Sequence, residues 1–416
     1  MAKKPPAPRL SDDQLFDWLR LIRSENVGPR TFRALLNACG GARAALEALP
    51  DLARRGGARR QIRVATTDEI DREFALARKL KVRFVALGEA DYPPVLRQID
   101  SAPPIVALRG REEALQQPAV AIVGSRNASA AGLTFADRLA RGIGQAGYVV
   151  VSGLARGVDQ RVHVASLATG TIGVLAGGHA RPYPEEAIPL IERIVEHGAV
   201  ISEMPIEWEP RGRDFPRRNR IVSGLALATV VVEAARSSGS LITARFALEQ
   251  NRQVFAAPGS PLDPRAEGTN ELLKQGASIC TSADDVVTAL APTRPTEMFA
   301  ALDDGGGAGE PLWAEHAILG VDPDTIPRTT PGEELDEAVG AAYVASDRLE
   351  AARDRIVALL GPAPITLDDL ARAAEASARD VRVALMELEL AGRIEFSGGD
   401  RVALKPADEA ERSSPP

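Results

Sequence analysis

The strongest local concentration of positive charge in the sequence lies at residues 211–220. This ten-residue stretch holds five arginines and one acid, with Phe215 among them. Arginine makes bidentate contacts with phosphate and an aromatic ring can stack on any base, which suits single-stranded nucleic acid of any sequence. The expected contacts are Arg211, Arg213, Phe215, Arg217, Arg218 and Asn219. The alternative is that some of these arginines, Arg218 and Arg220 above all, pair with acids inside the fold.

Two glycine-containing turns carry further arginines. Each turn follows a short apolar run, 120–123 or 148–151, and precedes an amphipathic stretch. Such a strand-to-helix turn presents backbone N–H groups and the positive end of a helix dipole to an anion. One turn of this kind more often serves packing, but two at the same edge of a sheet favour anion binding. The residues expected to bind are Gly124, Ser125 and Arg126 in the first turn and Gly153 and Arg156 in the second.

A third turn of small residues follows the apolar run 229–233. Its hydroxyls and its glycine can also approach an anion at the start of a helix, and the residues concerned are Ser238, Gly239 and Ser240.

His163 and His179 stand apart from other metal-ligating side chains. We therefore expect them to be structural, and we expect no metal site.

The strands and helices that position these turns are predicted from an alternation of apolar runs with amphipathic stretches. The β-branched runs predict short buried strands, each followed by a helix, at 120–123, 148–151, 171–175, 199–201, 229–233 and 253–255. This pattern predicts an α/β fold with a doubly wound, mostly parallel, Rossmann-like sheet. Ligands of such sheets bind at the carboxyl ends of the strands, where all three turns would lie.

The turns lack the signatures of the common nucleotide cofactors. No G-x-G-x-x-G fingerprint is present, and the second strand is followed by Ser152 and Gly153 instead of an acid for a ribose hydroxyl. No Walker loop is present either. We therefore expect no cofactor, no catalytic residues and no ATP hydrolysis.

Charge and composition divide the 416 residues into five segments. Residues 1–85 carry 18 basic and 10 acidic side chains and predict a small helical domain, of the SAM or helix-hairpin-helix type, whose first helix is capped by Ser11. Its turn at Gly28-Pro29 could present N–H groups to a phosphate beside Arg30 and Arg33, or it could be an ordinary turn in a helical bundle. The other predicted segments are a Rossmann-like domain at 86–295, an acidic flexible linker at 296–348, a winged-helix-like domain at 349–405 and a disordered tail at 406–416.

The winged-helix pattern consists of three helical stretches followed by a short hairpin. Its acids outnumber its basic residues, and phosphate binding needs a net basic face. We therefore expect an accessory module that contacts protein or binds DNA weakly.

Other features of the composition bear on the location of the protein. Cys39 and Cys280 are too few and too far apart for a disulfide framework, and we expect both to pack as small apolar residues. The N-terminal stretch has no apolar core typical of a signal peptide, and no apolar run is long enough to span a bilayer. The sequence thus predicts a cytoplasmic protein without a membrane partner.

Taken together, the segments resemble one family, the DNA-processing protein DprA, also called DNA-protecting or Smf proteins. The matching segments run in family order from about 91 to 285 and are 91–96, 121–126, 151–159, 201–203, 215–221, 238–244 and 257–259. Two positions depart from the family pattern, Gly178-His179-Ala180 before Tyr183-Pro184 and Arg161-Val162-His163 after the second turn. No role is carried over to the loop before Tyr183.

The resemblance implies a function and partners. It implies binding and protection of incoming single-stranded DNA, a homodimer, and help in loading the recombinase RecA during natural transformation. It also implies that Arg126 contacts a DNA phosphate, that Phe215 stacks on a base, and that the dimer forms near Leu272, Leu273 and Ile279.

The same residues are compatible with two other classes of protein. A hydrolase that cleaves the base-ribose bond of nucleoside monophosphates could use Ser238, Gly239, Ser240 and Thr243 as a phosphate grip, with Glu233 or Glu249 in catalysis. Alternatively, the chain could be an interaction scaffold, which predicts no salt-sensitive DNA binding.

Overall fold

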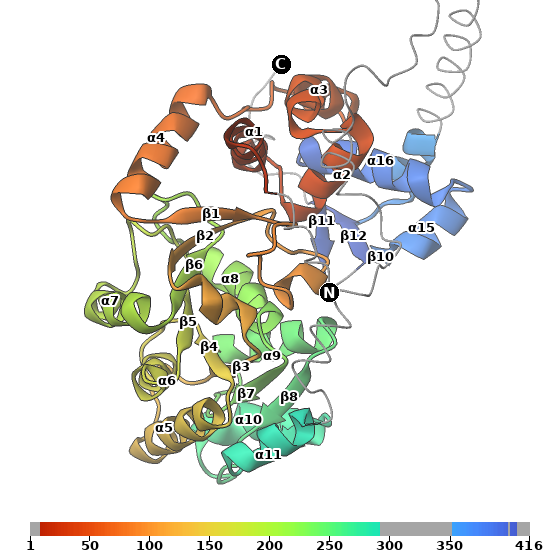
Figure 1. Ribbon diagram of the computed structural model, residues 1–416. Coiled ribbons are helices and arrows are strands. Elements are labelled where there is room, and N and C mark those ends of the chain that lie inside the picture. The colour runs from red at the N-terminus through yellow and green to blue at the C-terminus, as the bar shows by residue number, and fades with distance from the viewer. Residues whose placement is uncertain (1–8, 292–351, 398–399, 406–416) are drawn as a thin grey trace, which may run out of the picture. The chain divides into compact units, whose positions relative to one another are not determined.

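The computed structural model describes residues 9–291, 352–397 and 400–405 (Figure 1). These residues form two compact units. The sheet unit contains residue 9 and residues 68–291, and the terminal unit contains residues 10–67 together with the described residues from 352 onwards. The boundary expected at residue 85 differs from this division, because residues 83–86 form the first strand of the sheet. The predicted linker at 296–348 and the predicted tail at 406–416 lie outside the described residues.

A nine-stranded sheet organises the described part of the sheet unit. Its order is β1-β2-β6-β5-β4-β3-β7-β8-β9. Strand β2 pairs antiparallel with β1 and with β6, whereas all other pairs are parallel. The strands are β1 Arg83–Ala86, β2 Ile105–Gly110, β3 Ala119–Val123, β4 Val149–Ser152, β5 Thr171–Val174, β6 Ala199–Ser202, β7 Ala228–Val231, β8 Gln253–Ala256 and β9 Ser278–Ile279. The α/β class and the mostly parallel sheet are thereby confirmed.

Helices cover this sheet because its central strands are apolar on both faces. Side chains of α5, α6 and α11 join those of β3, β4 and β7 in one buried core cluster. Helices α8 and α9 pack against each other, and α9 contacts β7 and β8. The helices are α4 Thr67–Lys79, α5 Ala130–Gln145, α6 Val158–Ser166, α7 Ile188–His197, α8 Asp214–Gly224, α9 Gly239–Glu249, α10 Glu267–Lys274 and α11 Ala283–Leu290.

The terminal unit joins the two predicted small modules. Its N-terminal helices are α1 Asp12–Arg23, α2 Pro29–Cys39 and α3 Ala42–Arg55, and Ser11 caps α1 in a capping box as expected. Trp18 and Phe32 pack edge to face between α1 and α2, with ring centroids 5.0 Å apart. The winged helix consists of a helix at 352–359, β10 Ile365–Thr366, α15 Leu367–Ala373, α16 Ala378–Leu390, β11 Ile394–Ser397 and β12 Arg401–Leu404.

Both cysteines of the sheet and terminal units are free thiols. Cys280 is buried, and burial raises the pKa of its thiol to about 12. Cys39 is half-buried. None of the described helices has the length and apolar character needed to cross a bilayer.

Candidate nucleic-acid interface

The first two glycine turns touch each other at the carboxyl edge of the sheet. Strands β3 and β4 pair in parallel, and the Val158 N–H donates to the Ser125 carbonyl oxygen over 3.2 Å. Gly157 has φ +82°, and a Cβ there would lie 2.3 Å from the same oxygen. The close approach therefore requires glycine at this position. The expectation that these two turns lie side by side is confirmed.

The first turn also reaches the start of α8. Arg126 is exposed, and its Cζ lies 5.5 Å from the centroid of the half-buried Phe215 ring. An exposed cation and an aromatic ring are thus neighbours, although they lie far apart in the sequence. Arg156 of the second turn is exposed and pairs with Glu186, which is also exposed. A pair of this kind contributes little to stability, so Arg156 can exchange its partner for a phosphate.

The loop before α8 is held by Asp214. This buried carboxylate accepts hydrogen bonds from the Trp208 Nε1–H and the Arg211 backbone N–H, both over 2.8 Å. The Arg211 guanidinium lies over the Trp208 ring, 5.0 Å from its centroid. Arg213 is exposed beside it. The loop therefore presents two cations to solvent from a fixed backbone.

Glu203 holds two arginines of α8 at the end of β6. Its carboxylate accepts from the Arg217 Nε–H over 3.0 Å and pairs with Arg220. Burial raises the pKa of the Glu203 carboxyl, but the charges of Arg220 and Arg217 outweigh burial and lower it overall. Arg220 is buried, whereas Arg217 keeps 45% of its side chain exposed. Arg217 is thus positioned from inside the fold and open to a ligand.

Arg218 lies inside the fold. It is 6% exposed, and a Cβ at Gly153 would lie 1.6 Å from its Nη1, so the missing side chain at Gly153 makes room for it. Burial lowers the pKa of its guanidinium to about 10, and the carboxylate of Asp159 opposes this shift. The alternative of pairing with an acid inside the fold describes Arg220, which pairs with Glu203, whereas Arg218 is buried within the field of the Asp159 carboxylate. We therefore assign Arg218 a positioning role and remove it from the expected phosphate contacts.

The third turn is linked to α8 by Asn219. Its Nδ2–H donates to the Gly239 carbonyl oxygen over 3.2 Å. Ser238 caps α9, and its Oγ lies 2.7 Å from the Oγ of the buried Ser240. The hydroxyls of these serines therefore serve the cap. Gly239 is exposed, and nothing lies within 4 Å of where its Cβ would be, so its backbone is open to a ligand.

Sequence reasoning missed Tyr183. This side chain is 54% exposed, and its ring centroid lies 5.5 Å from that of Phe215, at an interplanar angle of 72°. Its loop is tied to the segment before α8, because the Gly178 N–H donates to Trp208 O and the Ala180 N–H to Ile206 O, both over 2.9 Å. The signal available in the sequence was an aromatic residue in the loop that follows the apolar run 171–175, at the predicted carboxyl edge of the sheet.

We expect Tyr183→Ala to weaken binding of single-stranded oligonucleotides about fivefold or more, because one base loses an aromatic surface. Tyr183→Phe keeps the ring and should bind as the parent does. Fluorescence anisotropy with labelled oligothymidine measures both variants. Equal affinity of Tyr183→Ala and the parent would remove Tyr183 from the interface.

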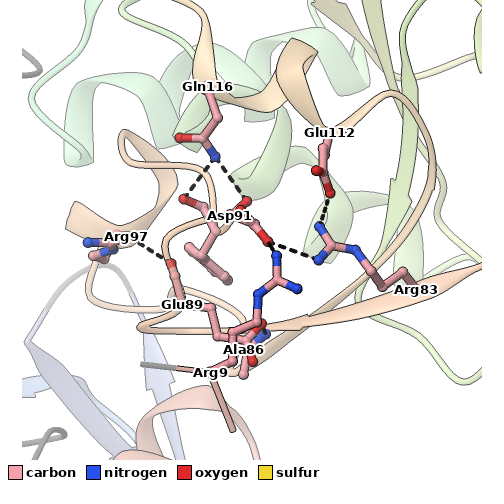
Figure 2. A network of polar contacts seen from close by, with 9 residues as sticks. Arg9, Arg83, Ala86, Glu89, Asp91, Arg97, Glu112 and Gln116 are labelled. Atoms are coloured by element: carbon pink, nitrogen blue, oxygen red, sulfur yellow. Dashed lines mark hydrogen bonds and ion pairs between the residues drawn. The ribbon is translucent and has the colours of Figure 1, made fainter. Parts of the chain in front are cut away.

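The family segment 91–96 begins with Asp91, which is held by ion pairs, and ends at Leu96, which packs against α8. Figure 2 shows Arg83 between Asp91 and Glu112, with Gln116 donating to the backbone of Asp91 over 2.9 Å. Burial raises the pKa of the Asp91 carboxyl, but Arg83 and Arg9 lower it overall. The loop leads to Leu96, which would lie 2.9 Å from a Cβ at Gly224, the last residue of α8.

The two isolated histidines are buried and hydrogen-bonded. His163 Nδ1 lies 2.8 Å from Thr171 Oγ1, and His179 Nε2 lies 2.9 Å from the Ala107 carbonyl oxygen. Burial lowers the pKa of His163 to about 3 and that of His179 to about 4, so both are neutral near pH 7. Across the described ranges, no group of histidine, cysteine and acidic side chains could hold a metal ion.

The fold defines a class of protein, a Rossmann-like domain combined with a helical hairpin module and a winged helix. A family model matches each of these three parts of the chain. Residues 83–291 match DNA recombination-mediator protein A, residues 12–75 match the DprA-like N-terminal HHH domain, and residues 340–400 match the DprA winged helix domain. The chain belongs to the DprA/Smf family.

Individual relatives support this assignment. The chain is 40% identical to the DNA processing protein DprA of Bacillus subtilis, over 52% of this chain and 74% of that one. It is 32% identical to protein Smf of Synechocystis, over 77% of this chain and 79% of that one. The X-ray structure of DNA processing protein A from Streptococcus pneumoniae superposes with a TM-score of 0.56 at 30% identity, covering 68% of this chain and 98% of that one.

Proposed function

We propose that this chain binds single-stranded DNA without sequence preference and protects it as a non-enzymatic mediator of recombination. The observation that carries the proposal is the contact of Arg126 with Phe215, because it joins a phosphate-binding cation to a stacking ring at the carboxyl edge of the sheet. Family membership supports the mediator role. Five arginines with exposed guanidinium groups or side chains line this region, namely Arg126, Arg156, Arg211, Arg213 and Arg217.

Titration at two salt concentrations tests the proposal. Each phosphate contact on a single strand contributes about −0.7 to the slope of log affinity against log salt, so five contacts give a slope no steeper than roughly −3.5. We expect a measurable negative slope and tighter binding of a single-stranded oligonucleotide than of a duplex of equal length. Binding that does not respond to salt, or no binding, would instead favour the interaction scaffold.

Both carboxylates that the hydrolase alternative would need have structural partners. Glu233 accepts from the backbone N–H and the Oγ–H of Ser129, over 2.9 Å and 2.6 Å, and so supports the cap of α5. Glu249 is the last residue of α9, whose first turn faces the site, and it pairs with Arg245. Both carboxylates thus have structural partners, which supports a non-enzymatic role over the hydrolase alternative. Release of free base from nucleoside monophosphates would contradict our proposal.

RecA and a second copy of the chain are proposed as partners on the strength of the family. Of the three residues expected near the dimer, Ile279 is exposed on β9 at the edge of the sheet, and Leu273 is half-buried. Leu272 is buried within its own unit and is not available for such a contact. We therefore place the proposed dimer contact at Ile279 and Leu273.

A further inference from the structure

Helix α16 of the winged helix is buried on more than one side. Val381, Leu385 and Leu388 face the winged-helix core. Met386 and Leu390 do not belong to that core, yet they are 4% and 1% exposed. The N-terminal helices α2 and α3 contact α16 and account for this second buried face (Figure 1).

The main chains of the two modules meet at Gly56. This residue follows α3, and a Cβ on it would lie 1.9 Å from the Glu387 carbonyl oxygen and 3.1 Å from the Ala391 Cβ. Its φ of −68° is ordinary for any residue. Glycine is therefore required here by the approach of α16 and not by the local backbone. Nearby, Asn26 Nδ2–H donates to the Leu390 carbonyl oxygen over 2.9 Å.

Two acids of α16 meet groups of the N-terminal module. The buried Glu387 lies 3.6 Å from Arg55 Nε. Glu389 accepts from the Thr31 Oγ–H over 2.5 Å, at the start of α2. Burial raises the pKa of the Glu389 carboxyl, although Thr31 and Arg30 favour its charged form. Side chains of the first turn of α2, which follows Gly28, are thus engaged by the winged helix.

A third contact comes from the hairpin of the winged helix. The Arg30 guanidinium lies over the Phe396 ring, 5.3 Å from its centroid. Arg353 donates from Nη1 to the Arg55 carbonyl oxygen over 2.9 Å, so the first helix of the winged helix takes part as well. Apolar, charged and main-chain contacts therefore all join the same two modules.

We infer that α16 is a protein-docking helix whose partner is the N-terminal helical module of this same chain, and that it does not read DNA. In winged-helix DNA readers the corresponding helix lies along the major groove between two rows of phosphates. Here residues 384–388 and Leu390 are buried, and the helix carries Glu387 and Glu389, which phosphates would repel. The partner module is basic, and its arginines meet these acids.

Gly56→Ala in the full-length chain tests the contact, because the added Cβ must push α16 away. Gly361→Ala is the matched control, since nothing lies within 4 Å of where its Cβ would be. Hydrogen-deuterium exchange should become about tenfold faster at residues 26–32 and 386–392 in Gly56→Ala but not in the control. Exchange in the sheet unit should not change. Unchanged exchange at both segments would overturn the inference.

A charge reversal provides a second variant that leaves the cores of both modules untouched. Glu389→Lys places a cation beside Arg30 and should also accelerate exchange at residues 26–32. Glu395→Lys makes the same charge change at an exposed position of β11 and should not. Duplex DNA binding is measured for all four variants. We expect no gain in Gly56→Ala, whereas tighter duplex binding on opening would show that the contact masks a DNA-reading helix and would contradict our inference.

Discussion

Phe215→Ala and Arg126→Ala should both lose affinity for single-stranded oligonucleotides, but with different signatures. Loss of the stacking ring costs about 1–3 kcal/mol of binding free energy for every sequence and leaves the salt slope unchanged. Loss of the Arg126 guanidinium removes one phosphate contact and should make the slope less steep by about 0.7. Anisotropy titrations with oligothymidine and oligoadenosine at several salt concentrations separate the two effects.

Matched variants make this pair of results decisive. Arg126→Lys keeps the charge and should retain the parent slope. Arg138→Ala removes an exposed arginine from the middle of α5, away from the carboxyl edge, and should bind as the parent does. A loss confined to one base composition, or a loss of equal size in Arg138→Ala, would show that the contact of Arg126 with Phe215 is not the binding site.

Glu203→Gln should destabilise the sheet unit by about 3–5 kcal/mol of unfolding free energy. The substitution leaves the buried Arg220 without its counter-charge, and removing one partner of a buried ion pair costs this much. Chemical denaturation followed by amide exchange in β5 and β6 reports this unit alone. Single-stranded DNA binding should also weaken, because Arg217 loses the carboxylate that positions it.

A surface ion pair provides the control for Glu203→Gln. Glu192 accepts two hydrogen bonds from Arg109, each 2.7 Å long, but half of its side chain is exposed. Glu192→Gln should therefore cost less than about 1 kcal/mol. Equal costs for the two variants would contradict the role given to burial at Glu203.

The stability contributed by Glu203 also depends on pH. The pKa of its carboxyl is lower in the folded chain than the ordinary value of 4.5. Its contribution is therefore fully present above that ordinary value and is lost as the pH falls through the lowered folded pKa. In Glu203→Gln this part of the acid-induced loss should disappear.

Sequence alone determined the sheet and the edge at which the site lies. Parallel strands joined by helices bring their carboxyl ends to one edge, so the turns after β3, β4 and β7 had to lie along that edge. Arg126, Arg156 and Gly239 could therefore be assigned to it from the order of apolar runs and glycines. Local patterns also determined the winged helix and the Ser11 cap, because each depends on residues close together in the sequence.

Tertiary structure alone decided which arginines of α8 face a ligand. Arg217 and Arg218 are adjacent in a run of basic residues, but Gly153 and Asp159 from the second turn receive Arg218, whereas Glu203 from the end of β6 holds Arg217 in the open. Tyr183 reaches Phe215 through hydrogen bonds of a distant loop, and α16 docks on the first helices through Gly56. Burial, charge pairing and close backbone approach arise between residues far apart in the chain, and a local pattern of residue types does not contain that information.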